Sequence, residues 1–203
     1  MIITLLKNET CVTVTWIKLC AQLLLLTGEA KYADWIEKSG YNALLGAVNT
    51  NECIVDFKSN PRYNKIITKN ETENGITDNG LPFDSYSPLL CDTRGRGVGG
   101  FMPMQKTTYY GCCASIGAAG LGLFGNLSAI YSKDGIVLNF YNNGTYSLKT
   151  PNGQDVVIQI ISGYPASSNI DIKFSLPHNE EFNIYFRVPE WCPCADICIN
   201  GKD

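Results

Sequence analysis

The residues best suited to chemistry are two adjacent cysteines, Cys112 and Cys113, taken together with Glu9 and Cys11 near the start of the chain. A thiolate is both a nucleophile and a soft metal ligand. One carboxylate and three sulfurs form a donor set that suits tetrahedral zinc, Zn²⁺. Because Cys11 and Cys112 lie far apart in the sequence, the predicted site depends on a tertiary fold that brings them together.

Charge and apolar patterning argue against two classes of partner, nucleic acids and membranes. The chain has 203 residues and a formal charge of −3, from 16 basic and 19 acidic side chains. Its closest basic pair, Arg94 and Arg96, offers too few charges to follow a phosphate backbone, so no nucleic-acid partner is predicted. A membrane partner is not predicted either, because Lys18 and Gln22 interrupt the most apolar run before it reaches the ~18 residues of a membrane span.

The numbers of cysteines and histidines limit the kinds of site that the chain can form. Nine cysteines is an odd number, whereas a secreted disulfide framework usually has an even one. The first residues lack the basic-then-apolar order of a signal peptide. These features favour a reduced, cytoplasmic protein that uses some thiols for metal binding or catalysis. The chain has a single histidine, which excludes a histidine-rich zinc site. This residue, His178, is predicted to lie on the surface.

Three helices are predicted to position the cysteines. Apolar residues recur at helical spacing over residues 12–26, and Thr27-Gly28 supplies a glycine stop. A second helix is predicted over residues 30–45, antiparallel to the first, with Gly40 inside it. The third covers residues 112–126, so that Cys112 and Cys113 lie at its N-terminus, where the helix dipole favours a thiolate.

The second part of the chain has a β pattern. Alternating apolar residues at 136–140, 156–160, 170–174 and 182–186, separated by turn residues, predict a β-sandwich. The predicted domains are therefore residues 1–128, largely helical, and residues 129–203. Within the first, residues 53–57 and 65–68 are predicted to pair as strands in a long connecting region.

Two further patterns have simpler interpretations. Residues 95–100 and 120–125 both match G-x-G-x-x-G, but neither follows a strand and opens a helix, as dinucleotide binding requires. In residues 120–125, which lie inside a predicted helix, the glycines are expected to let the backbones of neighbouring elements come close to that helix. Cys192, Cys194 and Cys198 are interpreted as structural thiols, since free cysteine commonly behaves as a small buried apolar residue.

Several stretches together resemble one known family. They are Glu9-Thr-Cys11, residues 24–28, Tyr32-Ala-Asp34, residues 41–45, Gly111-Cys-Cys113 and residues 186–191. This set is similar to glycoside hydrolase family 127, the β-L-arabinofuranosidases, over nearly the whole chain. The E-T-C and C-C motifs are the specific part of the resemblance.

The resemblance implies an α+β multidomain fold: part of an (α/α)6 helical toroid over residues 1–128, with an inserted β-hairpin and loop region, and then a β-sandwich. It implies that Glu9, Cys11, Cys112 and Cys113 hold zinc, and that Cys112 is the nucleophile of a retaining hydrolase, forming a thioglycosyl intermediate. In the family, the general acid/base glutamate lies shortly before E-T-C. No residue before Glu9 is acidic here, so we expect a fragment that lacks this group.

The resemblance also implies a class of substrate, and two other functions are considered beside it. The implied substrate is an arabinofuranoside-containing carbohydrate, with Tyr109, Tyr110 and Arg94 as candidate lining of the sugar pocket. The resemblance is also compatible with a homodimer of the full-length protein. Two other functions stay open at this point. One is a non-catalytic, zinc-stabilised carbohydrate-binding or interaction module, and the other is a redox sensor based on Cys112 and Cys113.

Overall fold

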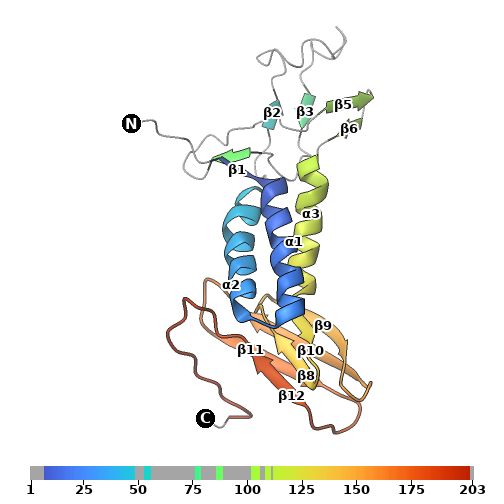
Figure 1. Ribbon diagram of the computed structural model, residues 1–203, viewed down its shortest axis with the longest axis vertical. Helices are drawn as coiled ribbons and strands as arrows, with labels where there is room; N and C mark the ends of the chain where they lie inside the picture. The colour runs from blue at the N-terminus through green and yellow to red at the C-terminus, as the bar shows by residue number, and fades with distance from the viewer. Residues whose placement is uncertain are drawn as a thin grey trace. The chain divides into compact units, whose positions relative to one another are not determined.

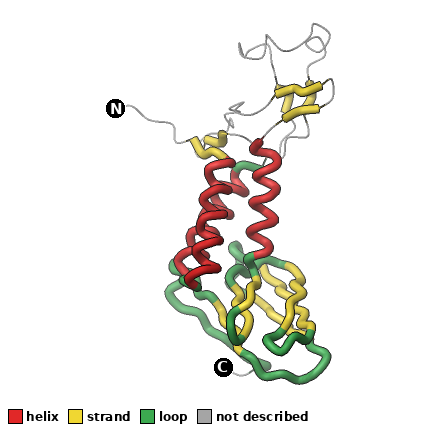
Figure 2. The backbone as a smooth tube through the Cα atoms, turned by 45° about the vertical axis from the view of Figure 1, so that its right-hand side comes forward, coloured by secondary structure: helices red, strands yellow, loops and turns green. Residues whose placement is uncertain are grey.

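The computed structural model describes residues 7–48, 53–55, 76–78, 86–88, 102–105, 108–110 and 112–201 (Figure 1). The chain forms two compact units. The first comprises Met1–Lys18 and Lys38–Leu121, and the second comprises Leu19–Glu37 and Gly122–Asp203. The mixture of helices and small sheets confirms the α+β class (Figure 2). The toroid, the complete sandwich and the boundary between residues 128 and 129 stay predictions.

The first helix, α1 (Thr10–Thr27), ends at the predicted glycine. Gly28 has φ +69°, and its N–H donates to the Leu24 carbonyl at 2.8 Å. A residue with a Cβ is strained in this left-handed conformation, which is why a glycine closes the helix. The prediction for this helix is confirmed, and the structure extends it by two residues at its start and one at its end.

The second predicted helix has two parts. An α-helix, α2 (Ala30–Lys38), continues directly as a π-helical segment, η1 (Ser39–Leu44). Gly40 is buried within this wider turn, and the side-chain amide of Asn42 donates to the Lys38 carbonyl at 2.7 Å. The third helix, α3 (Cys112–Asn126), has the predicted bounds.

In the first unit, short antiparallel strand pairs accompany the helices. They are β1 (Lys7–Glu9) with β4 (Tyr86–Pro88), β2 (Cys53–Val55) with β3 (Ile76–Asp78), and β5 (Met102–Gln105) with β6 (Thr108–Tyr110). The predicted partner of the strand near Cys53 was wrong. That strand pairs with residues 76–78, and residues 65–68 lie outside the described residues. Local pattern alone does not choose between two apolar runs as partners.

The second unit contains two three-stranded sheets. One has the order β9–β10–β11 and is antiparallel, and the other has the order β7–β8–β12, in which β8 and β12 run parallel. The strands are β7 (Ala129–Tyr131), β8 (Gly135–Leu138), β9 (Gly144–Lys149), β10 (Asp155–Ser162), β11 (Ile170–Ser175) and β12 (Asn183–Phe186).

A single apolar core joins these sheets. Along β10 buried and exposed residues alternate, so that Val156, Ile158 and Ile160 point inward. They pack with Ile136 and Leu138 of β8 in one cluster. Four of the six strands were predicted from their apolar runs, whereas β7 and β9 were not.

A buried ion pair connects α2 to the residue that follows β12. The guanidinium of Arg187 donates to Asp34 Oδ1 at 2.5 Å and to Glu37 Oε1 at 2.6 Å. Only 2% of the Arg187 side chain and 5% of the Glu37 side chain are exposed. The Tyr164 hydroxyl donates to Glu37 Oε1 at 2.5 Å, and the Trp191 indole N–H donates to Glu37 Oε2 at 3.0 Å. Each charge is therefore hydrogen-bonded as well as paired, which a buried ion pair requires.

Helix α1 is unusually apolar. In the part of the chain that the structure describes, it is the one helix long and apolar enough to cross a membrane. Lys18 and Gln22 do not lower its hydropathy as much as expected. A helix in the core of a soluble protein meets the same criteria, and α1 buries Val14, Ile17 and Leu24.

We expect Gly135→Ala to destabilise the second unit. A Cβ at this position would lie 1.9 Å from the Asn183 carbonyl oxygen of the adjacent parallel strand, a backbone atom that cannot rotate away. The expected loss is about 1–3 kcal/mol or more in the free energy of unfolding, measured by urea denaturation. Gly125→Ala is the matched control, because nothing lies within 4 Å of its added Cβ. Equal unfolding midpoints for the two variants would contradict the strand pairing described here.

Candidate metal centre

Glu9 and Cys11 lie where a strand passes into a helix. Glu9 is the last residue of β1 and lies opposite Tyr86 of β4, and Thr10 then begins α1. The Thr13 hydroxyl donates to the Glu9 carbonyl at 3.1 Å, and the Thr15 hydroxyl donates to the Cys11 carbonyl at 2.8 Å. These bonds fix the backbone of the first turn, so both side chains start from a rigid element.

The cysteine pair lies at the start of the other helix. Cys112 is the first residue of α3, as predicted, and Cys113 is the second and only 2% exposed. The positive end of a helix dipole favours a negatively charged group such as a thiolate in this position. The side chain of Cys112 is outside the described part of the structure.

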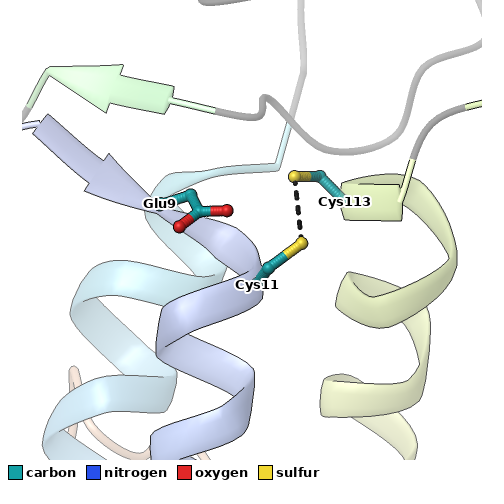
Figure 3. Close-up of side chains that lie close together, drawn as sticks. All are labelled: Glu9, Cys11 and Cys113. Atoms are coloured by element: carbon teal, nitrogen blue, oxygen red, sulfur yellow. Dashed lines mark hydrogen bonds between the residues drawn. The ribbon is translucent and has the colours of Figure 1, made fainter. Parts of the chain in front are cut away.

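Three of the four predicted ligands converge (Figure 3). Sγ of Cys11 and Sγ of Cys113 are 3.4 Å apart, and the ligand atoms of Glu9, Cys11 and Cys113 all lie within 4.8 Å of one another. Figure 3 shows the carboxylate and the two sulfurs directed toward a common space. Two sulfurs bound to one tetrahedral zinc at about 2.3 Å lie about 3.8 Å apart, close to the observed spacing. The donor set and its spacing therefore fit zinc with little rearrangement.

The structure does not describe the side chains of the predicted sugar-pocket residues. Tyr109 and Tyr110 belong to β6, where they lie opposite Pro103 and Met102 of β5. This strand ends shortly before α3 begins. The side chains of both tyrosines are outside the described part, as is all of Arg94. A role for these three residues in sugar binding stays a prediction.

Among the cysteines whose side chains the structure describes, Cys20, Cys192, Cys194 and Cys198 do not belong to this centre. Cys20 is buried in α1, and burial raises the pKa of its thiol, in keeping with a core residue. Cys194 and Cys198 are exposed, and Cys192 is half-buried, with its thiol donating to the Cys194 carbonyl at 2.9 Å. The interpretation of these three as buried structural thiols is therefore wrong for Cys194 and Cys198. They follow the last strand in a segment of turns, which leaves them at the surface.

Family models match both parts of the chain. The model described as the GH127 catalytic domain of beta-L-arabinofuranosidase matches residues 3–59, and the one described as the GH127 middle domain matches residues 135–203. The first range includes Glu9 and Cys11. No curated protein matches the chain.

Solved structures share the fold. A GH127 beta-L-arabinofuranosidase from Geobacillus stearothermophilus T6 superimposes with a TM-score of 0.65 and 20% identity, covering 97% of this chain and 27% of that one. A structure described as a glycoside hydrolase has a TM-score of 0.64 and 18% identity, covering 97% and 28%. A GH127 beta-arabinofuranosidase has a TM-score of 0.56 and 19% identity, covering 91% and 23%.

The likeness to these structures covers nearly all of this chain, although the chain spans only about a quarter of their length. The two family models describe two domains of one enzyme family, and they match successive parts of this chain. The motifs that carried the resemblance, the E-T-C at the start of α1 and the cysteine pair at the start of α3, are the ones that the fold brings together. The chain belongs to glycoside hydrolase family 127.

Proposed function

We propose that the chain carries the zinc–cysteine part of the active site of a retaining β-L-arabinofuranosidase. The observation that carries this proposal is the convergence of Glu9 from β1, Cys11 from α1 and Cys113 from α3, in a chain that belongs to this family. The relatives' names describe an arabinofuranosidase activity, and we extend it to the protein that contains this chain. The substrate is then an arabinofuranoside-containing carbohydrate.

In this proposal Glu9, Cys11, Cys112 and Cys113 hold one zinc ion. When bound, the ion keeps the sulfurs ionised at neutral pH and fixes their direction. Glu9 is a ligand here and does not transfer protons. Two observations support the assignment: the spacing of the two sulfurs suits a single ion, and the N-terminus of α3 favours a thiolate at Cys113.

Cys112 is assigned as the nucleophile because the resemblance to the family places this role on the first cysteine of the pair, which is the first residue of α3. Its sulfur attacks the anomeric carbon of the sugar, and the bond from that carbon to the leaving oxygen breaks. The departing alcohol takes a proton from a general acid. Water then attacks the same carbon and gives its proton to the conjugate base of that acid, the carbon–sulfur bond breaks, and the sulfur leaves as thiolate. Two inversions retain the configuration at the anomeric carbon.

The proposal includes the arrangement of domains. Residues 1–128 are assigned to the helical catalytic domain, as part of an (α/α)6 toroid, and residues 129–203 to a β-sandwich. Family models that match residues 3–59 and 135–203 support this assignment. A cytoplasmic location and a homodimeric full-length protein remain further parts of the same proposal.

A mechanism-based arabinofuranosyl inhibitor tests the nucleophile. We expect one adduct per chain, which peptide mapping by mass spectrometry places on Cys112, and a loss of about 10³-fold or more in turnover of the full-length protein for Cys112→Ser. Cys194→Ser is the control, because this exposed thiol is remote in sequence from the centre. Normal turnover by Cys112→Ser would refute the assignment. Sugar binding without any adduct would instead identify the non-catalytic binding module.

A further inference from the structure

One glycine in α3 lies against α1 with no space for a side chain. A Cβ added at Gly120 would be 2.7 Å from Val14 Cγ2 and 3.1 Å from Leu44 Cδ2. Real Cβ atoms essentially never approach a neighbour to 2.7 Å. Val14 is fully buried, and a β-branched side chain in a helix has one strongly preferred rotamer, so it has little freedom to move away. The helices are therefore as close as they are because residue 120 has no side chain.

This contact lies on the same helix faces as the metal centre. Val14 follows Cys11 by one turn of α1, and Gly120 follows Cys113 by two turns of α3. Residues at such spacings share one face of a helix. In α3, Gly117 lies between them and is buried, as are Cys113 and Gly120. The separation of the two helices at Gly120 therefore also affects the separation of the two sulfurs.

We propose that Gly120 is a positioning residue for the metal centre: it lets α3 approach α1 closely enough for Cys11 and Cys113 to bind one ion. The identity of the ion rests on the proposed function, whereas the approach of the two thiols does not. To restore ordinary contact at 3.4 Å, an alanine at residue 120 must shift its surroundings by about 0.7 Å. Metal–ligand distances tolerate only about 0.2 Å.

The neighbouring glycines provide matched controls. An added Cβ at Gly122 or Gly125 would meet nothing within 4 Å. All three glycines belong to the same helix and the same G-x-G-x-x-G pattern. Any general effect of alanine on helix propensity is therefore common to the three variants, and only Gly120→Ala changes the contact with Val14.

The first readout needs no metal. In metal-free protein, the Cys11 thiolate attacks glutathione disulfide and releases one glutathione. Cys113 then attacks Sγ of Cys11 in the mixed disulfide and releases the second, so that two thiols are oxidised and one disulfide is reduced. The second step depends on the 3.4 Å separation of the sulfurs. We expect Gly120→Ala to slow this step about tenfold or more relative to wild type and to Gly122→Ala. Peptide mapping identifies the Cys11–Cys113 bond.

The second readout uses the metal. Cobalt(II) titration, followed by thiolate charge-transfer absorption, and zinc competition with a chromophoric chelator should both show affinity weakened about tenfold or more in Gly120→Ala. The double variant Gly120→Ala/Val14→Ala removes both Cγ atoms of Val14 and should restore the disulfide rate and the affinity. This rescue also covers the case in which Gly120→Ala alone fails to fold. A folded double variant that stays slow would overturn the proposal.

Equal disulfide rates in Gly120→Ala and Gly122→Ala would also overturn it. If wild-type protein binds no zinc or cobalt while Gly120→Ala still slows the disulfide step, the proposed metal function fails and the positioning role stands. If wild type binds metal and Gly120→Ala leaves both readouts unchanged, the positioning role fails and the metal function stands. The two proposals are therefore separable.

Discussion

Replacing Cys113 with alanine is expected to weaken zinc binding by two to three orders of magnitude. Structural zinc sites with four ligands bind with about 10–16 kcal/mol, so one ligand accounts for roughly 2.5–4 kcal/mol. Cys113 is the most buried of the three candidate ligands whose side chains are described, and its sulfur lies 3.4 Å from that of Cys11. An alanine there removes one of the four proposed protein ligands, and a water molecule is a weaker replacement for a thiolate.

The measurement is metal analysis of purified protein, with about one zinc per chain expected for wild type and a loss of zinc on dialysis against a weak chelator for Cys113→Ala. Cys194→Ala should retain the ion, because its exposed thiol does not belong to the Glu9, Cys11 and Cys113 group. Unchanged zinc content and affinity in Cys113→Ala would remove this residue from the ligand set. Wild-type protein without zinc would refute the metal site as a whole.

Replacing Arg187 with methionine should cost about 3–5 kcal/mol in the free energy of unfolding. The change leaves two carboxylates, Asp34 and Glu37, without their cation, and Glu37 is only 4% exposed. Breaking a buried pair by removing one partner costs this much because an uncompensated buried charge remains. The change also removes the bond from Arg187 Nε to the Asn139 carbonyl, observed at 2.6 Å.

A surface ion pair provides the control. Lys149 and Asp155 are joined at 2.6 Å, but their side chains are 55% and 74% exposed. Lys149→Met should therefore change stability by about 0–1 kcal/mol. Urea denaturation of both variants tests the difference, with the same m-value expected for each. A similar small effect for Arg187→Met would mean that the buried network contributes little beyond its packing.

Burial also affects a tyrosine in this network. It raises the pKa of Tyr141 to about 12, and its hydroxyl donates to the Arg187 carbonyl at 2.6 Å. The neutral form is thus favoured in the folded protein. Because an unfolded tyrosine titrates near pH 10, this contribution to stability is complete below about pH 10 and is lost as the pH rises toward about 12.

Local pattern was sufficient for the helices that position the centre. Gly28 marked the end of α1, and the run of small and apolar residues after Cys112 gave the bounds of α3. These features depend on neighbours in the sequence, where helical spacing and glycine conformation act. The same kind of reasoning missed β9, because this strand has only two large apolar residues, Tyr146 and Leu148, and both are only half buried.

Contacts between residues far apart in the sequence were harder to predict from the sequence. The ligand set was predicted from residue types and a family resemblance, and only the fold brought Glu9, Cys11 and Cys113 together. The Arg187 network was not predicted, although one signal existed. Glu37 lies one turn after Ala33 on the buried face of α2, where a charge requires a partner. Sequence pattern indicates that such a partner exists but not which of the distant cations it is.

The wide separation of Glu37 and Arg187 has a consequence for synthesis of the protein. The two residues are 150 positions apart, so at about 5–20 residues per second a nascent chain carries the carboxylates of α2 for roughly 8–30 s before their cation leaves the ribosome. Strand β12, which pairs in parallel with β8, is synthesised immediately before Arg187. Until then the carboxylates must remain hydrated, and this region can complete its folding only near the end of translation of these residues.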